Sequence, residues 1–364
     1  MQLKKLIGFV LLGIGFYACQ ENNLPKPTQP TSTPFSLQLP AHFGKKFTIP
    51  PDNALTEEGI ALGRMLFYDV RLSRNNSTSC ASCHEQKRAF SDGLAFSVGF
   101  RGKTTSRSAM ALVNLLWVDK FFWDGRANSL EEQALHPIVD SIEMGMTLKD
   151  LEQKLQQIPE YPPLFLKAFG AENITAENIA KAIAQFERTL ISSNSKYDKI
   201  VRNEIQPTAQ ELRAIQLFFT HPLPEANLRG ANCGDCHGSH LITLNTFHDN
   251  GLDLNPTDIG LANVTKQPFD LGKRRAPTLR NIALTAPYMH DGRFKTLREV
   301  LDHYNEHIQL SPNIDPLILN ASNEPNGKTL QLTEQEKEDI LLFLQMLTDE
   351  EFINNPAFAN PFQK

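Results

Sequence analysis

Two short motifs hold the residues whose types and spacing point most clearly to chemistry in this 364-residue chain. The first consists of Cys80, Cys83 and His84, and the second of Cys233, Cys236 and His237. A Cys-x-x-Cys-His run is typical of c-type haem attachment, in which two thiols add to the haem vinyl groups and the histidine binds iron. Two thioethers fix one edge of the porphyrin, so the adjacent histidine can reach the iron as its proximal ligand. The sequence therefore predicts two covalently bound haem c groups.

Other uses of paired cysteines fit less well. A zinc ribbon separates its Cys-x-x-Cys pairs by about 15–20 residues, whereas these pairs lie about 150 residues apart. A thioredoxin-like site needs one such pair beside a βαβ pattern, and neither pair is surrounded by alternating strand and helix signals. Structural disulfides would not require a histidine at the same place in both motifs.

Length and charge limit the class of protein. The size allows two domains, and one haem motif falls in each half. The formal net charge of −5 is made of dispersed charges of both signs, which argues against nucleic-acid binding. A mildly acidic surface could receive a basic electron-donor protein.

The N-terminus has the pattern of an export signal. Lys4 and Lys5 precede an apolar run from residue 6 to residue 17, which is too short to span a bilayer but suits a signal peptide. The run ends at Ala18-Cys19, which resembles a lipoprotein cleavage site, so we expect a signal peptide over 1–18 and a lipid on Cys19. The alternative is a discarded signal cysteine. Export agrees with haem c attachment and predicts a periplasmic protein held to a membrane by its lipid anchor only.

The rest of the chain is predicted to be mainly α, with two cytochrome c-like haem domains and long loops. A Pro-rich tether is expected over 19–45, a first haem domain over 46–205, a second over 206–350 and a tail over 351–364. A helix is predicted over 57–67. Apolar stripes at helical spacing and two capping boxes predict further helices. The stripes are Ile179, Ile183, Phe186 and Leu190; Leu212, Ile215 and Phe219 after Thr208 and Glu211; Leu297, Val300, Leu301 and Tyr304; and Ile340, Phe343, Leu344 and Leu347 after Thr333 and Glu336.

Several further motifs occur in a fixed order around the two haem motifs. They are Phe121 to Ala127 (FFWDGRA), Gln133, Pro137, Ile142 to Gly145 (IEMG), Arg275 to Asn281 (RAPTLRN) and Ala286 to Arg293 (APYMHDGR). Together they resemble the bacterial dihaem cytochrome c peroxidase family, which includes the methylamine-utilisation dihaem enzyme MauG. The resemblance covers residues from about 50 to 350.

The resemblance implies a division of labour between the haems. The N-terminal haem would react with peroxide, and the C-terminal haem would store and relay electrons. Trp123 matches the family's bridging tryptophan, although a core aromatic is the alternative. Glu143 matches the carboxylate at the open haem face, where a positioned acid can move a proton between the peroxide oxygens. Gln133 matches the neighbouring amide that orients peroxide or water.

One departure from the family concerns the N-terminal haem. Peroxidases that require prior reduction carry a blocking histidine about sixteen residues after the proximal one, in a Ser-x-Gly-His loop. Here the loop is Ser97-Val98-Gly99-Phe100, and a phenylalanine cannot bind iron. We therefore expect this haem to be open to peroxide in the oxidised protein, without a reductive switch.

A second departure concerns the C-terminal haem. The peroxidases place a methionine ligand about fourteen residues beyond the His-Asp-Gly histidine, here His290, and that count ends at Tyr304, as in the MauG branch. Core packing is the alternative role for Tyr304, and Met289 and His303 are its rivals as ligand. A methionine ligand raises haem potential, whereas an anionic phenolate oxygen should favour ferric iron.

The family often holds a calcium ion between its domains. Thr285 and Pro287 match positions that offer carbonyl oxygens, which suit this hard cation. Ser108 stands where the resemblance leads one to expect a side-chain amide ligand. His290 is expected to pack near the second haem rather than to bind iron.

Three functions follow from these features. The first is reduction of hydrogen peroxide to water with electrons from a small donor such as cytochrome c. The second is MauG-like oxidation of a partner protein by a high-valent dihaem state. The third is a non-catalytic electron-transfer dihaem cytochrome, which would need both irons closed by protein ligands. The sequence contains no feature that decides between a monomer and the homodimer common in the family.

Overall fold

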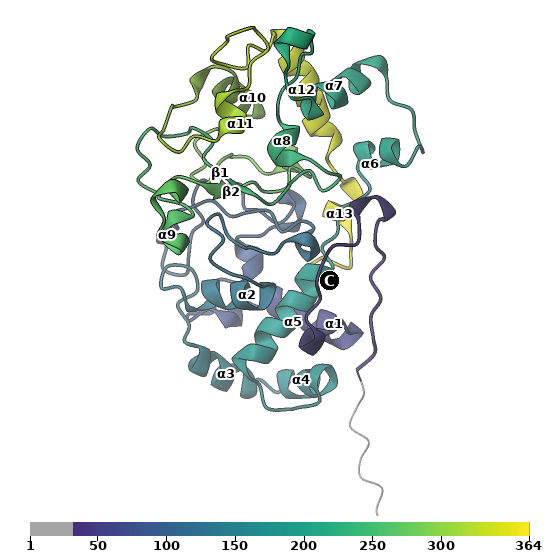
Figure 1. The fold of residues 1–364 in the computed structure, drawn as a ribbon. Coiled ribbons are helices and arrows are strands. Elements are labelled where there is room, and N and C mark those ends of the chain that lie inside the picture. Colours follow the sequence, from purple (N-terminus) through teal and green to yellow (C-terminus); the bar gives the residue numbers. More distant parts are fainter. Residues whose placement is uncertain (1–31, 364) are drawn as a thin grey trace, which may run out of the picture. The chain divides into compact units, whose positions relative to one another are not determined.

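The computed structural model describes residues 32–363 of the chain (Figure 1). The predicted signal peptide, the lipidation site at Cys19 and the first part of the tether lie outside the described residues. Short helices joined by long loops dominate, and the only strands in the described region are the two-residue pair β1 (Phe247–His248) and β2 (Arg274–Arg275). The predicted mainly α fold is thus confirmed. No helix within residues 32–363 is both long and apolar enough to cross a membrane.

The N-terminal half is built on α1 (Glu57–Tyr68) and α5 (Ala176–Arg188), with α2 (Leu130–Val139), α3 (Leu148–Gln156) and α4 (Tyr161–Phe169) around them. The predicted helix over 57–67 is confirmed. The two long helices approach closely at Gly63, where an added Cβ would lie 1.8 Å from the Ala182 carbonyl oxygen. The predicted apolar stripe of α5 is also confirmed, since Ile179, Ile183 and Phe186 are fully buried.

The C-terminal half is built on α7 (Ala209–Phe219) and α12 (Glu334–Met346), with α8 (Gly234–His237), α10 (Leu297–Asp302) and α11 (Pro316–Leu319) nearby (Figure 1). Both predicted capping boxes form, at the first residues of α7 and of α12. The α12 stripe is buried as predicted.

The buried face of α7 differs from the prediction. Ala214 and Phe218 are buried, whereas Leu212 is 46% exposed. The Phe218 ring packs on Phe343 of α12, with ring centroids 4.5 Å apart. Adjacent phenylalanines lie on different faces of a helix, and the tertiary partner decides which one is buried.

Residues 32–363 belong to one compact unit, within which each half has its own apolar core. The helix α6 (Lys196–Val201) ends before the predicted break near residue 205, and the domain boundaries themselves stay a prediction. The segment after α12 returns to the N-terminal half. There Phe352 of α13 (Glu350–Asn354) and Phe358 join the aromatic core around Phe67 and Phe90.

Candidate haem sites

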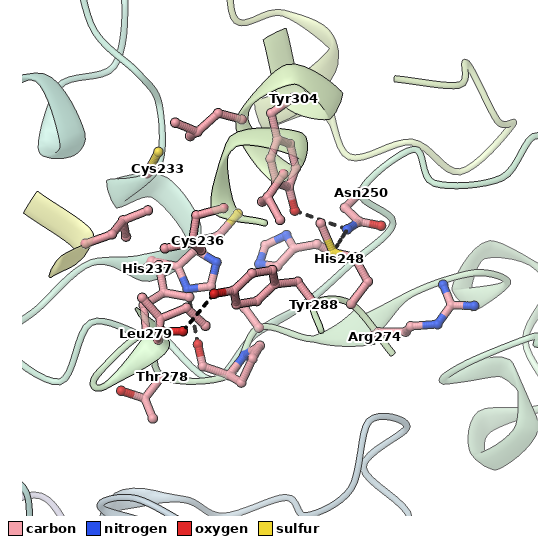
Figure 2. Close-up of a pocket in the computed structure, with 18 of the residues that line it drawn as sticks. Cys233, Cys236, His237, His248, Asn250, Arg274, Thr278, Leu279, Tyr288 and Tyr304 are labelled. Atoms are coloured by element: carbon pink, nitrogen blue, oxygen red, sulfur yellow. Dashed lines mark hydrogen bonds between the residues drawn. The ribbon is translucent and has the colours of Figure 1, made fainter. Parts of the chain in front are cut away.

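The second Cys-x-x-Cys-His motif opens onto a cavity of about 230 Å³ (Figure 2). Cys233, Cys236 and His237 line this cavity, and His237 is the last residue of the four-residue helix α8. Most of the remaining wall is apolar, from side chains that include Phe218, Leu279, Leu301, Leu330 and Leu344. An apolar cavity with two thiols and one imidazole at its edge suits a covalently attached porphyrin.

Both motif histidines have a ring orientation that leaves Nε2 free to bind a metal. The His237 Nδ1 lies 3.1 Å from the Pro277 carbonyl oxygen, and the His84 Nδ1 lies 2.7 Å from that of Phe90. An Nδ1–H that donates to a carbonyl leaves the Nε2 lone pair free, as is usual for metal-binding histidines. Burial lowers the pKa of both imidazoles, to about 4 for His237, so that each is neutral at pH 7.

The four motif thiols form no disulfide with one another. Burial is the main cause that raises the pKa of each thiol, to about 11 for Cys83 and to about 12 for Cys233 and Cys236. Zinc knuckles depend on easily formed thiolates. Neutral, partly buried thiols beside an imidazole instead fit thioether attachment.

The surroundings of the first motif bring together two segments that are far apart in the sequence. The loop at Gly99 packs on the turn after α2 so closely that an added Cβ would lie 1.8 Å from the Ile142 carbonyl oxygen. The Phe100 N–H donates to the Glu143 carbonyl oxygen at 3.0 Å, and the buried Phe100 ring covers Gly145. This loop, in which a blocking histidine would stand, offers no ligating side chain at Phe100.

Glu143 has the electrostatics of a proton carrier. Its side chain is partly buried, and burial together with the nearby Asp140 charge raises the pKa of the carboxyl to about 7. The Glu143 charge in turn raises the pKa of the Cys80 and Cys83 thiols, which places it close to the first motif. Gln133 lies on α2, partly buried, and no hydrogen bond joins its amide to Glu143 within residues 32–363.

Trp123 lies at the wall of the C-terminal cavity. Its ring lines the cavity, and its Nε1–H donates to the Ser108 carbonyl oxygen at 3.0 Å. Its own carbonyl accepts from the Arg275 N–H of β2 at 2.9 Å. The segment that follows Ser108 also reaches the first site, because the Met110 backbone lies close enough to the His84 imidazole to affect its pKa. Trp123 is therefore fixed to a segment that contacts both motifs.

An ion-paired chain joins the loop that carries Trp123 to the C-terminal half. Arg107 bridges Asp124 and Asp258, with nitrogen–oxygen distances of 2.7 Å to each. The pairing with Arg107 lowers the pKa of Asp258 to about 2, against the effect of burial. Asp124 belongs to the FFWDGRA motif, whereas Arg107 and Asp258 lie in no motif, and nothing in the sequence shows that the three residues meet.

The candidate ligands of the second iron converge inside the cavity. Tyr304 and Met289 both line it, and the Asn250 amide donates to the Tyr304 oxygen at 3.1 Å (Figure 2). Tyr304 lies in a π-helical turn, His303–His307, a feature often found at functional sites. Burial raises the pKa of the Tyr304 phenol. The other rival of Tyr304, His303, does not line the cavity, and its Nε2 is 3.0 Å from the Asn250 backbone carbonyl oxygen.

Two buried polar atoms in the cavity wall have no hydrogen-bond partner among residues 32–363. They are the Nε of Arg274 and the Nδ1 of His290, whose residues are 8% and 4% exposed. Unpaired buried polar atoms are costly, and the carboxylates of a haem would supply acceptors. Burial lowers the pKa of His290 to about 4, so this imidazole is neutral. The cavity thus fits haem in both its apolar and its polar groups.

Thr285 and Pro287, the predicted calcium positions, also line the C-terminal cavity. Ser108 donates its hydroxyl to the Met289 carbonyl oxygen at 2.8 Å, so its proton is already engaged. Within residues 32–363 no three His, Cys, Asp or Glu side chains cluster as a metal site. A calcium site here would depend on carbonyl oxygens and stays a prediction.

Comparison with known proteins agrees with this geometry. A family model for di-haem cytochrome c peroxidases matches residues 57–206. The methylamine utilization protein MauG of Methylorubrum extorquens is 35% identical over 86% of this chain and 85% of its own length. The cytochrome c551 peroxidase of Nitrosomonas europaea is 35% identical over 70% of this chain and 74% of its own length.

A solved structure shows the same fold over nearly the whole chain. It is the crystal structure of a MauG-like protein associated with microbial copper homeostasis, with a TM-score of 0.81 and 36% identity over 90% of this chain and all of that one. The chain belongs to the di-haem cytochrome c peroxidase family, which includes both the peroxidases and MauG. It is therefore an oxidoreductase, and its family implies two haem c groups.

Proposed function

We propose that the chain is a periplasmic dihaem peroxidase that reduces hydrogen peroxide to two waters with electrons from a small donor such as cytochrome c. The observation that carries the proposal is the contact between the Phe100 loop and the Glu143 turn. One segment offers no iron ligand, and the other holds a carboxyl with a pKa of about 7. An open site next to a proton carrier is what peroxide reduction requires.

The bound haems would supply the redox chemistry. His84 and His237 would hold the irons, since each donates its Nδ1–H to a carbonyl and has its other ring nitrogen free. Glu143 accepts a proton from one peroxide oxygen and returns it to the other, so that the O–O bond breaks with water as the leaving group. Gln133 orients peroxide, and Trp123 links the two sites. Each peroxide takes up two electrons and two protons.

Steady turnover tests this proposal. The holoprotein with two haems should oxidise reduced cytochrome c when peroxide is added, and Glu143→Gln should slow turnover by about 10²–10⁴-fold. The control is Glu225→Gln, because Glu225 is an exposed acid in the C-terminal half. Absence of turnover by the unmodified protein with a panel of small donors would refute the proposal.

A second function is favoured by the position of Tyr304 in the C-terminal cavity. A phenolate ligand favours oxidised iron, and an oxidised dihaem centre that persists could oxidise a partner protein, as MauG-like chemistry would require. The two functions differ in the lifetime of the peroxide-treated protein. A state that persists without donor and then oxidises an added protein would favour the second function. Rapid return of the peroxide-treated protein to its starting spectrum when reduced cytochrome c is added would favour the first function.

Three further features belong to the proposal. A lipid on Cys19 would hold the protein to a membrane, and labelling with a radioactive fatty acid should be lost in Cys19→Ser. A calcium ion bound by the carbonyls of Thr285 and Pro287 should be removed by a chelator, which metal analysis would show. Light scattering of the holoprotein distinguishes a monomer from a homodimer.

A further inference from the structure

The Asn250 side chain contacts both residues that could bind the second iron. Its Nδ2 lies 3.1 Å from the Tyr304 oxygen and 3.6 Å from the Met289 sulfur. An amide nitrogen carries two hydrogens, so one side chain can donate to both groups at once. Figure 2 shows Asn250 with dashed lines to the Tyr304 oxygen and to a sulfur atom.

Asn250 is firmly placed by its neighbours on both sides. The backbone carbonyl oxygen of Asn250 is 3.0 Å from the Nε2 of His303, the residue that precedes Tyr304. The next residue, Gly251, has a φ of +67°, and its carbonyl accepts from the Gln309 N–H at 2.7 Å. An added Cβ on Gly251 would lie 2.6 Å from the Ile314 side chain. The amide is therefore positioned from two segments of the C-terminal half.

Met289 is also held in an unusual backbone conformation. Its φ is +72°, in the left-handed region that residues with a side chain rarely adopt. The Ser108 hydroxyl fixes its carbonyl oxygen at 2.8 Å. Strained backbone persists where the surroundings determine it, and it gathers at functional sites. The strain here directs a thioether into the cavity that Tyr304 also enters.

We propose that Asn250 is the positioning residue that selects Tyr304 over Met289 as the iron ligand of the C-terminal haem. The inference rests on the proposed function, in which this haem relays electrons. A phenol oxygen that accepts the amide hydrogen still has a lone pair for a metal, so the bond aims the oxygen without blocking it. The Met289 sulfur would likewise keep a lone pair, so the amide acts on it by position: it holds the sulfur beside Asn250, and this contact keeps the thioether from the iron. Loss of the amide removes both effects and favours Met289.

The test uses the oxidised holoprotein with two haems. Asn250→Leu removes both donor hydrogens, and Asn250→Asp keeps the size of the side chain without the amide donor. In each variant we expect the C-terminal haem to gain the red charge-transfer band of thioether–ferric haem. We also expect its midpoint potential to rise, because methionine ligands raise it. The band should disappear again in Asn250→Leu combined with Met289→Leu.

The matched control is Asn313→Leu, because the Asn313 amide also donates two hydrogen bonds, but to the carbonyls of Pro268 and Leu271 outside the cavity. It should leave both the spectrum and the potential unchanged. Met289→Leu alone should also leave the spectrum unchanged, and a change there would contradict the inference even if neither Asn250 variant incorporates haem.

The remaining outcomes separate this inference from the proposed function. If Tyr304→Phe leaves the spectrum of the C-terminal haem unchanged, Tyr304 is not a ligand, and the inference fails together with the ligand assignment. If Tyr304→Phe changes the spectrum while both Asn250 variants keep the unmodified spectrum and potential, only the role of Asn250 is refuted. Peroxidase turnover is measured separately and can fail or persist in either case.

Discussion

The two haem motifs are the same five-residue pattern placed in different surroundings. In both, a partly buried histidine donates its Nδ1–H to a carbonyl, at 2.7 Å for His84 and at 3.1 Å for His237. Near the first motif stand Phe100, which has no ligating atom, and Glu143, whose pKa is about 7. The second motif faces a cavity that contains a phenol and a thioether held by one amide.

The difference teaches how one protein can give identical cofactors different tasks. Under the proposed function, the attachment chemistry and the proximal ligand would be shared, so they could not distinguish the sites. The residues that differ are those that reach the other coordination position or carry protons to it. An open position beside an acid suits reaction with peroxide, whereas a position with a candidate ligand suits storage and transfer of electrons.

The largest expected effect comes from removing one attachment site at a time. Replacing Cys80 and Cys83 by serine should abolish the reaction of the oxidised protein with peroxide, because the open site loses its haem. Replacing Cys233 and Cys236 by serine should preserve that first reaction but abolish turnover with cytochrome c. Haem content per chain and stopped-flow spectra measure both effects. The reverse pattern would mean that the roles of the two haems are exchanged.

The next effect is a pH dependence specific to the first site. The pKa of Glu143 is raised to about 7 mainly by burial, and only the carboxylate form can accept a proton from peroxide. The rate of the first reaction should therefore fall as the pH drops below about 7, by about tenfold for each pH unit well below it. Glu143→Gln should react slowly, and its rate should not show this fall below pH 7. A wild-type rate that is flat between pH 5 and 8 would exclude Glu143 as the base.

A smaller effect should follow when the connection between the sites is altered. Trp123→Phe removes the indole and its hydrogen bond to Ser108, and it should slow electron passage from the C-terminal haem by about tenfold, equal to about 1.4 kcal/mol of barrier. Trp117→Phe is the control, because Trp117 donates to Gly44 and does not line the C-terminal cavity. Equal effects of the two substitutions in flash-photolysis or stopped-flow measurements would argue against a special role for Trp123.

The last expected effect concerns the scaffold of the first site and is measured as stability rather than as a rate. Gly63→Ala should force α1 away from α5, because the new Cβ would meet the Ala182 carbonyl oxygen at 1.8 Å. Overpacking of this kind costs about 1–3 kcal/mol, which lowers the Tm by several degrees. The exposed Ala61 on the same helix offers a control, Ala61→Ser. An unchanged Tm in calorimetry would mean that the two helices separate without cost.

Much of this comparison is already present in the sequence. The capping boxes of α7 and α12 and the stripe of α5 depend on neighbours within a few residues, and each prediction is confirmed. The Cys-x-x-Cys-His motifs are equally local, and haem attachment at them stays a prediction. The positions of Phe100 and Glu143 were suggested by family resemblance, since they are far apart in the chain and meet only through the packing of Gly99 on Ile142.

Residues that depend on tertiary partners could not be predicted. Asn250 has no local pattern, and its importance follows from the meeting of three segments at Tyr304. The Arg107 bridge joins segments about 150 residues apart. The prediction of the buried face of α7 was wrong, because contact with α12, rather than the periodicity of α7 itself, decides that Phe218 is buried. The return of Phe352 to the N-terminal core likewise has no signature in the tail itself.

The most direct test of the account is to mix the oxidised holoprotein with one equivalent of hydrogen peroxide, without reductant, and to follow the haem spectra. The account predicts rapid consumption of peroxide with loss of the ferric bands of the N-terminal haem. Phe100→His, which introduces a potential ligand into the loop, should not react until one electron is added. If the unmodified protein also stays unchanged until it is reduced, a protein ligand closes the first site and the central claim is wrong.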